Sequence, residues 1–122
     1  MKSPQNEADF SAAVERSMQI RRLYNELENR KHGGPWTKQE DLIGFVSDVG
    51  ELGRLVMAAE GRWIHHGDLD KELGGKLAEC LWWIFVLSSR LGIDVTTAFA
   101  SKMSELESSL SSSVENADEN FP

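Results

Sequence analysis

The segment from Leu77 to Leu87 constrains the fold more than any other part of the sequence. It is apolar almost all the way round a helix, and Glu79 is its one charged residue. A helix of this kind in a soluble protein has to be buried on several sides. The chain has 122 residues, enough for one core but not for two. Because a bundle of this size could scarcely cover such a helix, we expect a subunit interface along it.

The rest of the chain favours helices and no strands. No segment alternates apolar and polar residues between turn signals, whereas apolar residues recur at helical spacing throughout. The first helix is predicted from about Glu7 to Lys31, before the stop signal at residues 32–35. The second is predicted from Thr37 to about Glu60. Thr37 and Glu40 have the spacing of a capping box there.

Two more helices complete the predicted architecture. Asp68 or Asp70 can cap a third helix that ends near Leu91, and Asp94 can cap a fourth. The fourth helix carries an apolar stripe of Val95, Phe99, Met103, Leu106 and Leu110. The polar run that follows has little to pack, so we expect residues 1–110 to form one helical domain and residues 111–122 a disordered tail. The expected fold class is all-α, a four-helix bundle completed by oligomerisation.

Net charge and composition limit the kinds of partner and the cellular compartment that we expect for this protein. Asp and Glu outnumber Lys and Arg by 20 to 13, for a formal net charge of -7, which disfavours nucleic acid as a partner. The longest apolar stretch, residues 80–87, is far below the roughly 20 residues of a membrane-spanning helix. The first ten residues lack the apolar core of a secretory signal, and the single cysteine, Cys80, suits a reducing compartment. We therefore expect a cytoplasmic protein with neither nucleic-acid nor membrane partners.

Three carboxylates stand out from the helical background. Asp48 and Glu51 are three residues apart, on neighbouring turns of one helix face, and Glu79 interrupts the apolar run. Carboxylates that project from two helices toward one point can hold Mg2+ or Mn2+, which prefer oxygen ligands. Two plainer interpretations stay open. Asp48 and Glu51 can lie on a solvated helix face, and Glu79 can pair with Lys76 at i to i+3.

Several further residues can have a functional role or a purely structural one. Trp63, in the loop after the second helix, can stack on a base, whereas Trp82 and Trp83 are better explained by packing in a core or an interface. Arg62 can reach a phosphate. Gly50 and Gly53 lie inside a helix, where glycine is unfavourable, and indicate close approach of another helix.

The sequence resembles the MazG-like all-α nucleoside triphosphate pyrophosphohydrolases in three segments: residues 41–52, Lys76 to Trp83, and Leu91 to Asp94. The resemblance covers about Trp36 to Leu110. In that family an E-x-x-E motif on one helix and an E-x-x-D motif before a Leu-Trp pair on the next hold Mg2+ for the triphosphate. Asp48 and Glu51 match the first motif, and Glu79 matches the last position of the second. Lys76 stands where the family has an acid, and a protonated lysine cannot ligate a metal.

The resemblance implies an enzyme that hydrolyses a (d)NTP to the monophosphate and pyrophosphate with Mg2+ or Mn2+. It implies metal ligands at Asp48, Glu51 and Glu79, and a proton acceptor at Glu51 or Asp48. Lys76 and Lys102 join Arg62 and Trp63 as substrate-binding candidates, Lys102 because relatives often carry a lysine in the fourth helix. The alternative is a non-catalytic nucleotide-binding or helical oligomerisation protein, in which Lys76 acts as a built-in cation. Either form is expected to be a dimer or a dimer of dimers.

Overall fold

The computed structural model describes residues 9–31 and 34–120, and every regular element in these ranges is an α-helix. The helices are α1 (Ser11–Lys31), α2 (Lys38–Ala59), α3 (Leu69–Arg90) and α4 (Val95–Asn120). The predicted all-α architecture of four helices is therefore confirmed. In the described part of the chain no single helix is both long and apolar enough to cross a membrane.

The helix boundaries follow local signals in the sequence. Thr37 accepts a hydrogen bond from the Glu40 backbone N–H, and the Glu40 side chain accepts one from the Thr37 N–H, which completes the capping box. Asp68, rather than Asp70, caps α3 by accepting from the Lys71 N–H. Gly61 follows α2 with a φ of 73°, a left-handed conformation that costs other residues more. The expected helix start at Glu7 lies outside the described residues, and α1 begins at Ser11.

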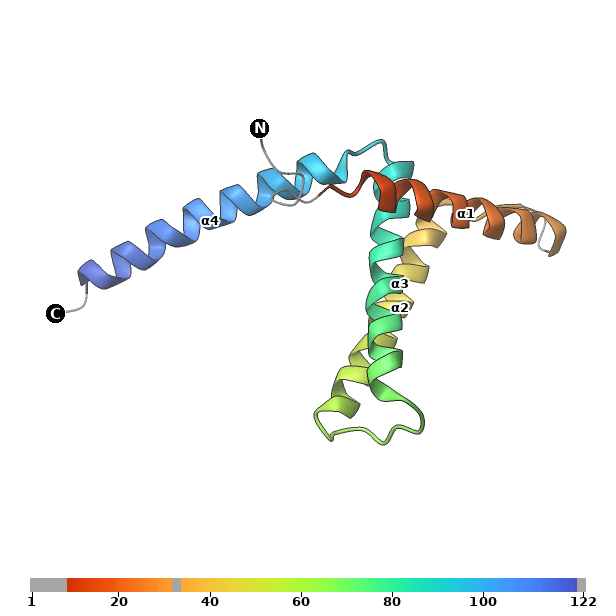
Figure 1. Cartoon of the computed structure of the whole chain (residues 1–122), viewed down its shortest axis with the longest axis horizontal. Coiled ribbons are helices and arrows are strands. Elements are labelled where there is room, and N and C mark those ends of the chain that lie inside the picture. The colour runs from red at the N-terminus through yellow and green to blue at the C-terminus, as the bar shows by residue number, and fades with distance from the viewer. Residues whose placement is uncertain (1–8, 32–33, 121–122) are drawn as a thin grey trace.

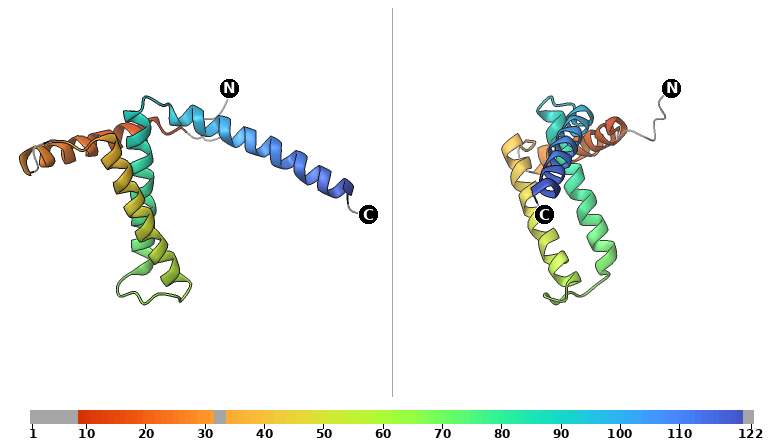
Figure 2. Two further views of the ribbon diagram at one scale, coloured as in Figure 1. Left: turned by 180° about the vertical axis from the view of Figure 1, so that it is seen from behind. Right: turned by 90° about the vertical axis from the view of Figure 1, so that its left-hand side faces the viewer.

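The helices form a T (Figure 1). Helices α2 and α3 make an antiparallel hairpin, and α1 packs across α3 near the end of the hairpin where α3 finishes, a region called the hairpin head below. The indole N–H of Trp82 in α3 donates to the Ser17 carbonyl of α1 over 3.2 Å. From the head, α1 and α4 run in opposite directions, as both views in Figure 2 also show. The chain turns by 109° between α3 and α4.

A buried ionic cluster ties three helices together at the hairpin head. The Asp41 carboxylate of α2 is completely buried. It pairs with Arg90 of α3 and with Arg21 of α1, whose guanidinium lies 3.3 Å from it. Arg21 also approaches Glu28, and Glu28 accepts a hydrogen bond from the Trp36 backbone N–H. Because each charge has an opposite partner, the cluster avoids the high cost of a lone buried ion.

The expected four-helix bundle was one completed by oligomerisation, and within one chain helix α4 does not close a bundle. It projects from the hairpin head as a free-standing helix (Figure 1). It also continues to Asn120, whereas disorder was expected after residue 110. Val114 follows Leu110 at helical spacing and extends the apolar stripe by one more turn.

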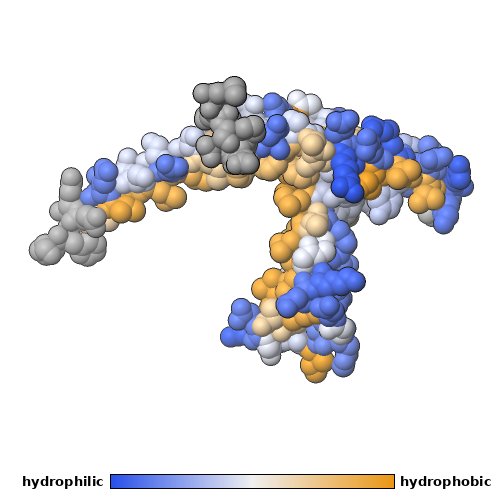
Figure 3. All heavy atoms as spheres, viewed as in Figure 1, coloured by the Kyte–Doolittle hydropathy of each residue, from blue (hydrophilic) through white to orange (hydrophobic). Residues whose placement is uncertain are grey.

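Much apolar surface stays exposed in the single chain. Among the residues that the structure describes, the buried apolar side chains are those of Cys80, Trp83, Phe85 and Val86, whereas Leu77, Leu81 and Ile84 of the same helix are exposed. The chain exposes 9484 Å², against roughly 6,600 Å² for a compact monomer of its mass. Apolar residues line both the hairpin and the edge of α4 that faces it (Figure 3). The expectation that one chain could not cover α3 agrees with this surface.

Candidate functional site

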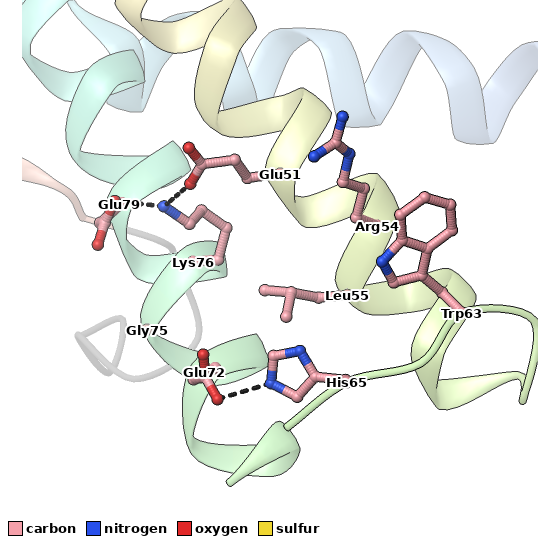
Figure 4. Close-up of a pocket in the computed structure, with 9 residues that line it drawn as sticks. All are labelled: Glu51, Arg54, Leu55, Trp63, His65, Glu72, Gly75, Lys76 and Glu79. Atoms are coloured by element: carbon pink, nitrogen blue, oxygen red, sulfur yellow. Dashed lines mark hydrogen bonds and ion pairs between the residues drawn. The ribbon is translucent and has the colours of Figure 1, made fainter. Parts of the chain in front are cut away.

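The candidate site is centred on the ammonium group of Lys76 in α3. Its Nζ lies 2.7 Å from Glu51 Oε2 and 3.1 Å from Asp48 Oδ1, both on α2. It also lies 2.9 Å from Glu79 Oε2, one turn further along α3. Antiparallel packing of α2 against α3 thus brings together the predicted carboxylates, and the pairing of Glu79 with Lys76 is present (Figure 4).

These contacts leave the cluster negatively charged and Lys76 firmly protonated. Hydrogen bonding to Glu51 above all, and then to Glu79 and Asp48, raises the pKa of Lys76 above its ordinary value, while burial acts in the opposite direction. The Lys76 side chain is only 15% exposed, whereas those of Glu51 and Glu79 are 58% and 56% exposed. Three carboxylates around one ammonium carry a formal charge of -2.

Asp48 is held from two sides. Its Oδ1 accepts from Lys76, and its Oδ2 accepts from the indole N–H of Trp83 over 2.6 Å. Trp83 is buried and stacks on Trp36 with 6.2 Å between ring centroids. Gly44 makes room for this indole, because a Cβ at residue 44 would lie 2.6 Å from Trp83. Asp48 is therefore the positioned carboxylate, and Glu51 and Glu79 are the more accessible ones.

A pocket of about 430 Å³ opens beside the cluster. It is lined by Glu51, Arg54, Leu55, Trp63, His65, Glu72, Gly75, Lys76 and Glu79. The guanidinium carbon of Arg54 lies 5.7 Å from the centre of the Trp63 ring, and His65 Nε2 lies 2.7 Å from Glu72 Oε2 (Figure 4). A cation, an aromatic face and several carboxylates therefore share one concavity of a size suited to a small ligand.

The structure separates the predicted substrate-binding residues. Lys76 and Trp63 line this pocket, whereas Arg62 lines a separate one together with Trp63 and Ile64. Lys102 lies on α4, where it pairs with Glu105 over 3.2 Å, and it is not among the residues that line the pocket. Neither Arg62 nor Lys102 belongs to the site as one chain forms it.

Other expectations at the site need correction. Gly50 and Gly53 border open space rather than another helix, and the glycine in close contact is Gly44. Glu72, one turn before Lys76 on α3, pairs with His65 rather than with Lys76. In the described ranges, no three His, Cys, Asp or Glu side chains are placed to hold a metal by themselves. Lys76 lies where the carboxylates converge.

Sequence reasoning missed Arg54, and it assigned His65 and Glu72 no place in the site. Arg54 follows Glu51 by three residues, so the helical spacing was available as a signal. The pairing of His65 with Glu72 depends on the path of the loop between α2 and α3, which the sequence does not specify.

No family model, no curated protein and no solved structure matches this chain. The functional conclusion therefore depends on the geometry of the site.

Proposed function

We propose that this protein is a Mg2+-dependent nucleoside triphosphate pyrophosphohydrolase that converts a (d)NTP to the (d)NMP and pyrophosphate. One observation carries the proposal. Asp48, Glu51 and Glu79 converge from two packed helices beside a pocket that also holds Arg54 and Trp63. Acidic groups for a divalent cation and a cationic and aromatic lining for a nucleotide thus lie side by side.

The donor set suits Mg2+ once substrate is present. Glu51 and Glu79 each give one oxygen to Lys76, and their second oxygens have no hydrogen-bond partner among the described residues. Mg2+ in such sites is commonly held by one or two carboxylates together with waters and substrate phosphates. Glu79 would hold it through its second oxygen, and Mn2+ would fit the same oxygen. When bound, the cation supplies positive charge that offsets the charge of the triphosphate.

The chain's own residues have distinct roles in this proposal. Glu51, accessible and next to the pocket, accepts the proton of the water that attacks the α-phosphorus. Asp48, with both oxygens engaged, fixes Lys76 in place. The Arg54 guanidinium faces the phosphates, Trp63 offers its ring to the base, and the Lys76 ammonium holds the three carboxylates together.

A second candidate is favoured by the position of Lys76. Its ammonium already neutralises part of the charge of all three carboxylates. A protein of this kind would bind a nucleotide in the same pocket without cleaving it. The two candidates differ in turnover and not in binding.

We further propose that the protein is cytoplasmic and works as a homo-oligomer. Its lone cysteine, Cys80, is buried, and burial raises the pKa of the thiol, which fits a reducing compartment. The large exposed apolar area supports self-association.

The experiment is to incubate the purified protein with Mg2+ and a panel of NTPs and dNTPs, and to measure pyrophosphate and orthophosphate separately. We expect pyrophosphate from at least one nucleotide, lost with EDTA and reduced at least a hundredfold in Glu51→Gln. Glu105→Gln, an acid on α4 outside the pocket, is the matched control. Nucleotide binding by wild type without any pyrophosphate would establish the second candidate instead.

A further inference from the structure

Two helices carry apolar stripes that the described part of the chain leaves largely exposed. On α1 the stripe is Ile20, Leu23, Tyr24 and Leu27, at the i, i+3, i+4, i+7 spacing of one helix face. On α4 it is Met103, Leu106, Leu110 and Val114. Leu23 is 62% and Leu110 61% exposed. Stripes of this extent are typical of helices that pack against a partner.

The two stripes cannot meet within one chain. Among the described residues, α1 and α4 approach each other near their first residues: the Phe10 ring, just before α1, lies 5.5 Å from the Phe99 ring of α4, and the Phe10 N–H donates to Thr96 Oγ1. From there they run away from the hairpin head in opposite directions (Figures 1 and 2). The described part of the chain therefore leaves both stripes open to another molecule.

The charges of the two helices are complementary. Helix α1 carries five basic residues, Arg16, Arg21, Arg22, Arg30 and Lys31, against three acidic ones, Glu15, Glu26 and Glu28. From Val95 to Ala117, α4 carries Lys102 against Glu105, Glu107 and Glu115. Net charges of opposite sign favour α1 against α4, whereas two α4 helices would repel one another.

We propose that two copies of this chain pair about a two-fold axis so that α4 of each copy lies along α1 of the other. Because α1 and α4 point in opposite directions from the head, a half-turn about the hairpin direction brings each beside its counterpart, running the same way. Their lengths also match, at about 32 and 39 Å for 21 and 26 residues. One symmetric contact then covers all four exposed stripes.

The exposed area is sufficient for a stable dimer. The chain exceeds the surface of a compact monomer by roughly 2,900 Å². Even a third of that excess exceeds the roughly 800 Å² per partner of a standard interface. This pairing goes beyond the proposed hydrolysis, and its test needs no nucleotide.

Cross-linking tests the pairing directly. Leu23→Cys on α1 and Leu106→Cys on α4 are prepared separately, mixed, and treated with a short bis-maleimide, with buried Cys80 left in place. We expect a covalent dimer from the mixture and little from either variant alone. A covalent dimer from Leu106→Cys alone would show pairing between α4 helices and overturn the proposal. So would a wild-type protein that sediments as a monomer at micromolar concentration.

A charge placed in the stripe gives an independent readout. Leu110→Glu should weaken dimerisation at least tenfold in sedimentation equilibrium while helix content by circular dichroism is kept, because Leu110 is exposed in the single chain. Ser109→Glu, also exposed but outside the stripe, is the matched control. Equal dimerisation of Leu110→Glu and wild type would contradict the role of this face.

Discussion

Replacing Lys76 with methionine tests the electrostatic centre of the site. Methionine keeps most of the length and apolar stem of lysine but removes the ammonium that three carboxylates share. Asp48, Glu51 and Glu79 then face one another without an opposing charge. We expect the folded protein to be less stable, and to recover part of that stability when Mg2+ is added.

The loss of folding stability in Lys76→Met can be worked out from how exposed each of the three carboxylates is. The pairs with Glu51 and Glu79 involve carboxylates that are more than half exposed, so each contributes about 0.5 kcal/mol. The pair with Asp48 is largely shielded from water, and a hydrogen bond between charged groups there contributes about 1 to 1.5 kcal/mol. The total is about 2 kcal/mol, which corresponds to a fall in Tm of about 8 °C for a chain of this length.

The pH dependence has a definite sign. The folded-state pKa of Lys76 lies above its ordinary value of 10.5, so its contribution is fully present below that pH and is lost as pH rises through the folded-state pKa. Thermal unfolding of wild type and Lys76→Met should therefore differ by a constant amount between about pH 7 and 10. Lys102→Met removes an exposed pair with Glu105 and should change the stability by less than about 0.5 kcal/mol. If Lys76→Met were as stable as wild type, or no worse than Lys102→Met, the shared ammonium would not stabilise the fold.

Three more predictions follow from the same contacts. Lys76→Glu, which adds an acid and removes the competing cation, should bind Mg2+ more tightly by calorimetry and release pyrophosphate faster, and loss of both would mean that Lys76 acts on the substrate phosphates. Gly44→Ala should destabilise the fold by about 1 to 3 kcal/mol in urea unfolding, because the added Cβ meets Trp83. The control, Gly53→Ala, has open space around it and should stabilise the fold by about 0.5 to 1 kcal/mol. Equal effects of the two substitutions would contradict the packing at Gly44. Asp41→Asn leaves Arg21 and Arg90 without their shared carboxylate and should cost about 3 to 5 kcal/mol in the same assay, and a neutral result would mean that this cluster is solvated.

The parts of the fold that were predicted correctly depend on short-range signals. The capping box depends on Thr37 and Glu40, three residues apart, and the ion pair of Lys76 with Glu79 has the same short spacing. The course of α4 depends on a short turn and on surfaces elsewhere in the chain, so the sequence could not show that it projects away from the hairpin. Asp41, Arg21 and Arg90 each read as ordinary surface charges, because they are far apart in sequence and become neighbours only when three helices meet.

The candidate site was predicted only in part, because it too depends on contacts between residues that are far apart in the sequence. Helical spacing places Asp48 near Glu51, but it does not say that both face Lys76 across the hairpin. Nor could it distinguish Gly44 from Gly50 and Gly53, since the relevant neighbour, Trp83, belongs to another helix. The convergence of carboxylates from two helices was expected from their chemistry, and the contacts of Lys76 bring Asp48, Glu51 and Glu79 together.

The most direct test of the central proposal is to follow the oxygen of water during turnover. The protein is incubated with Mg2+ and a cleaved nucleotide in water enriched in oxygen-18, and the products are analysed by mass spectrometry. Attack at the α-phosphorus by a water that Glu51 deprotonates predicts one labelled oxygen in the nucleoside monophosphate and none in pyrophosphate. Label in pyrophosphate or orthophosphate, or turnover that persists in Glu51→Gln, would contradict the proposal.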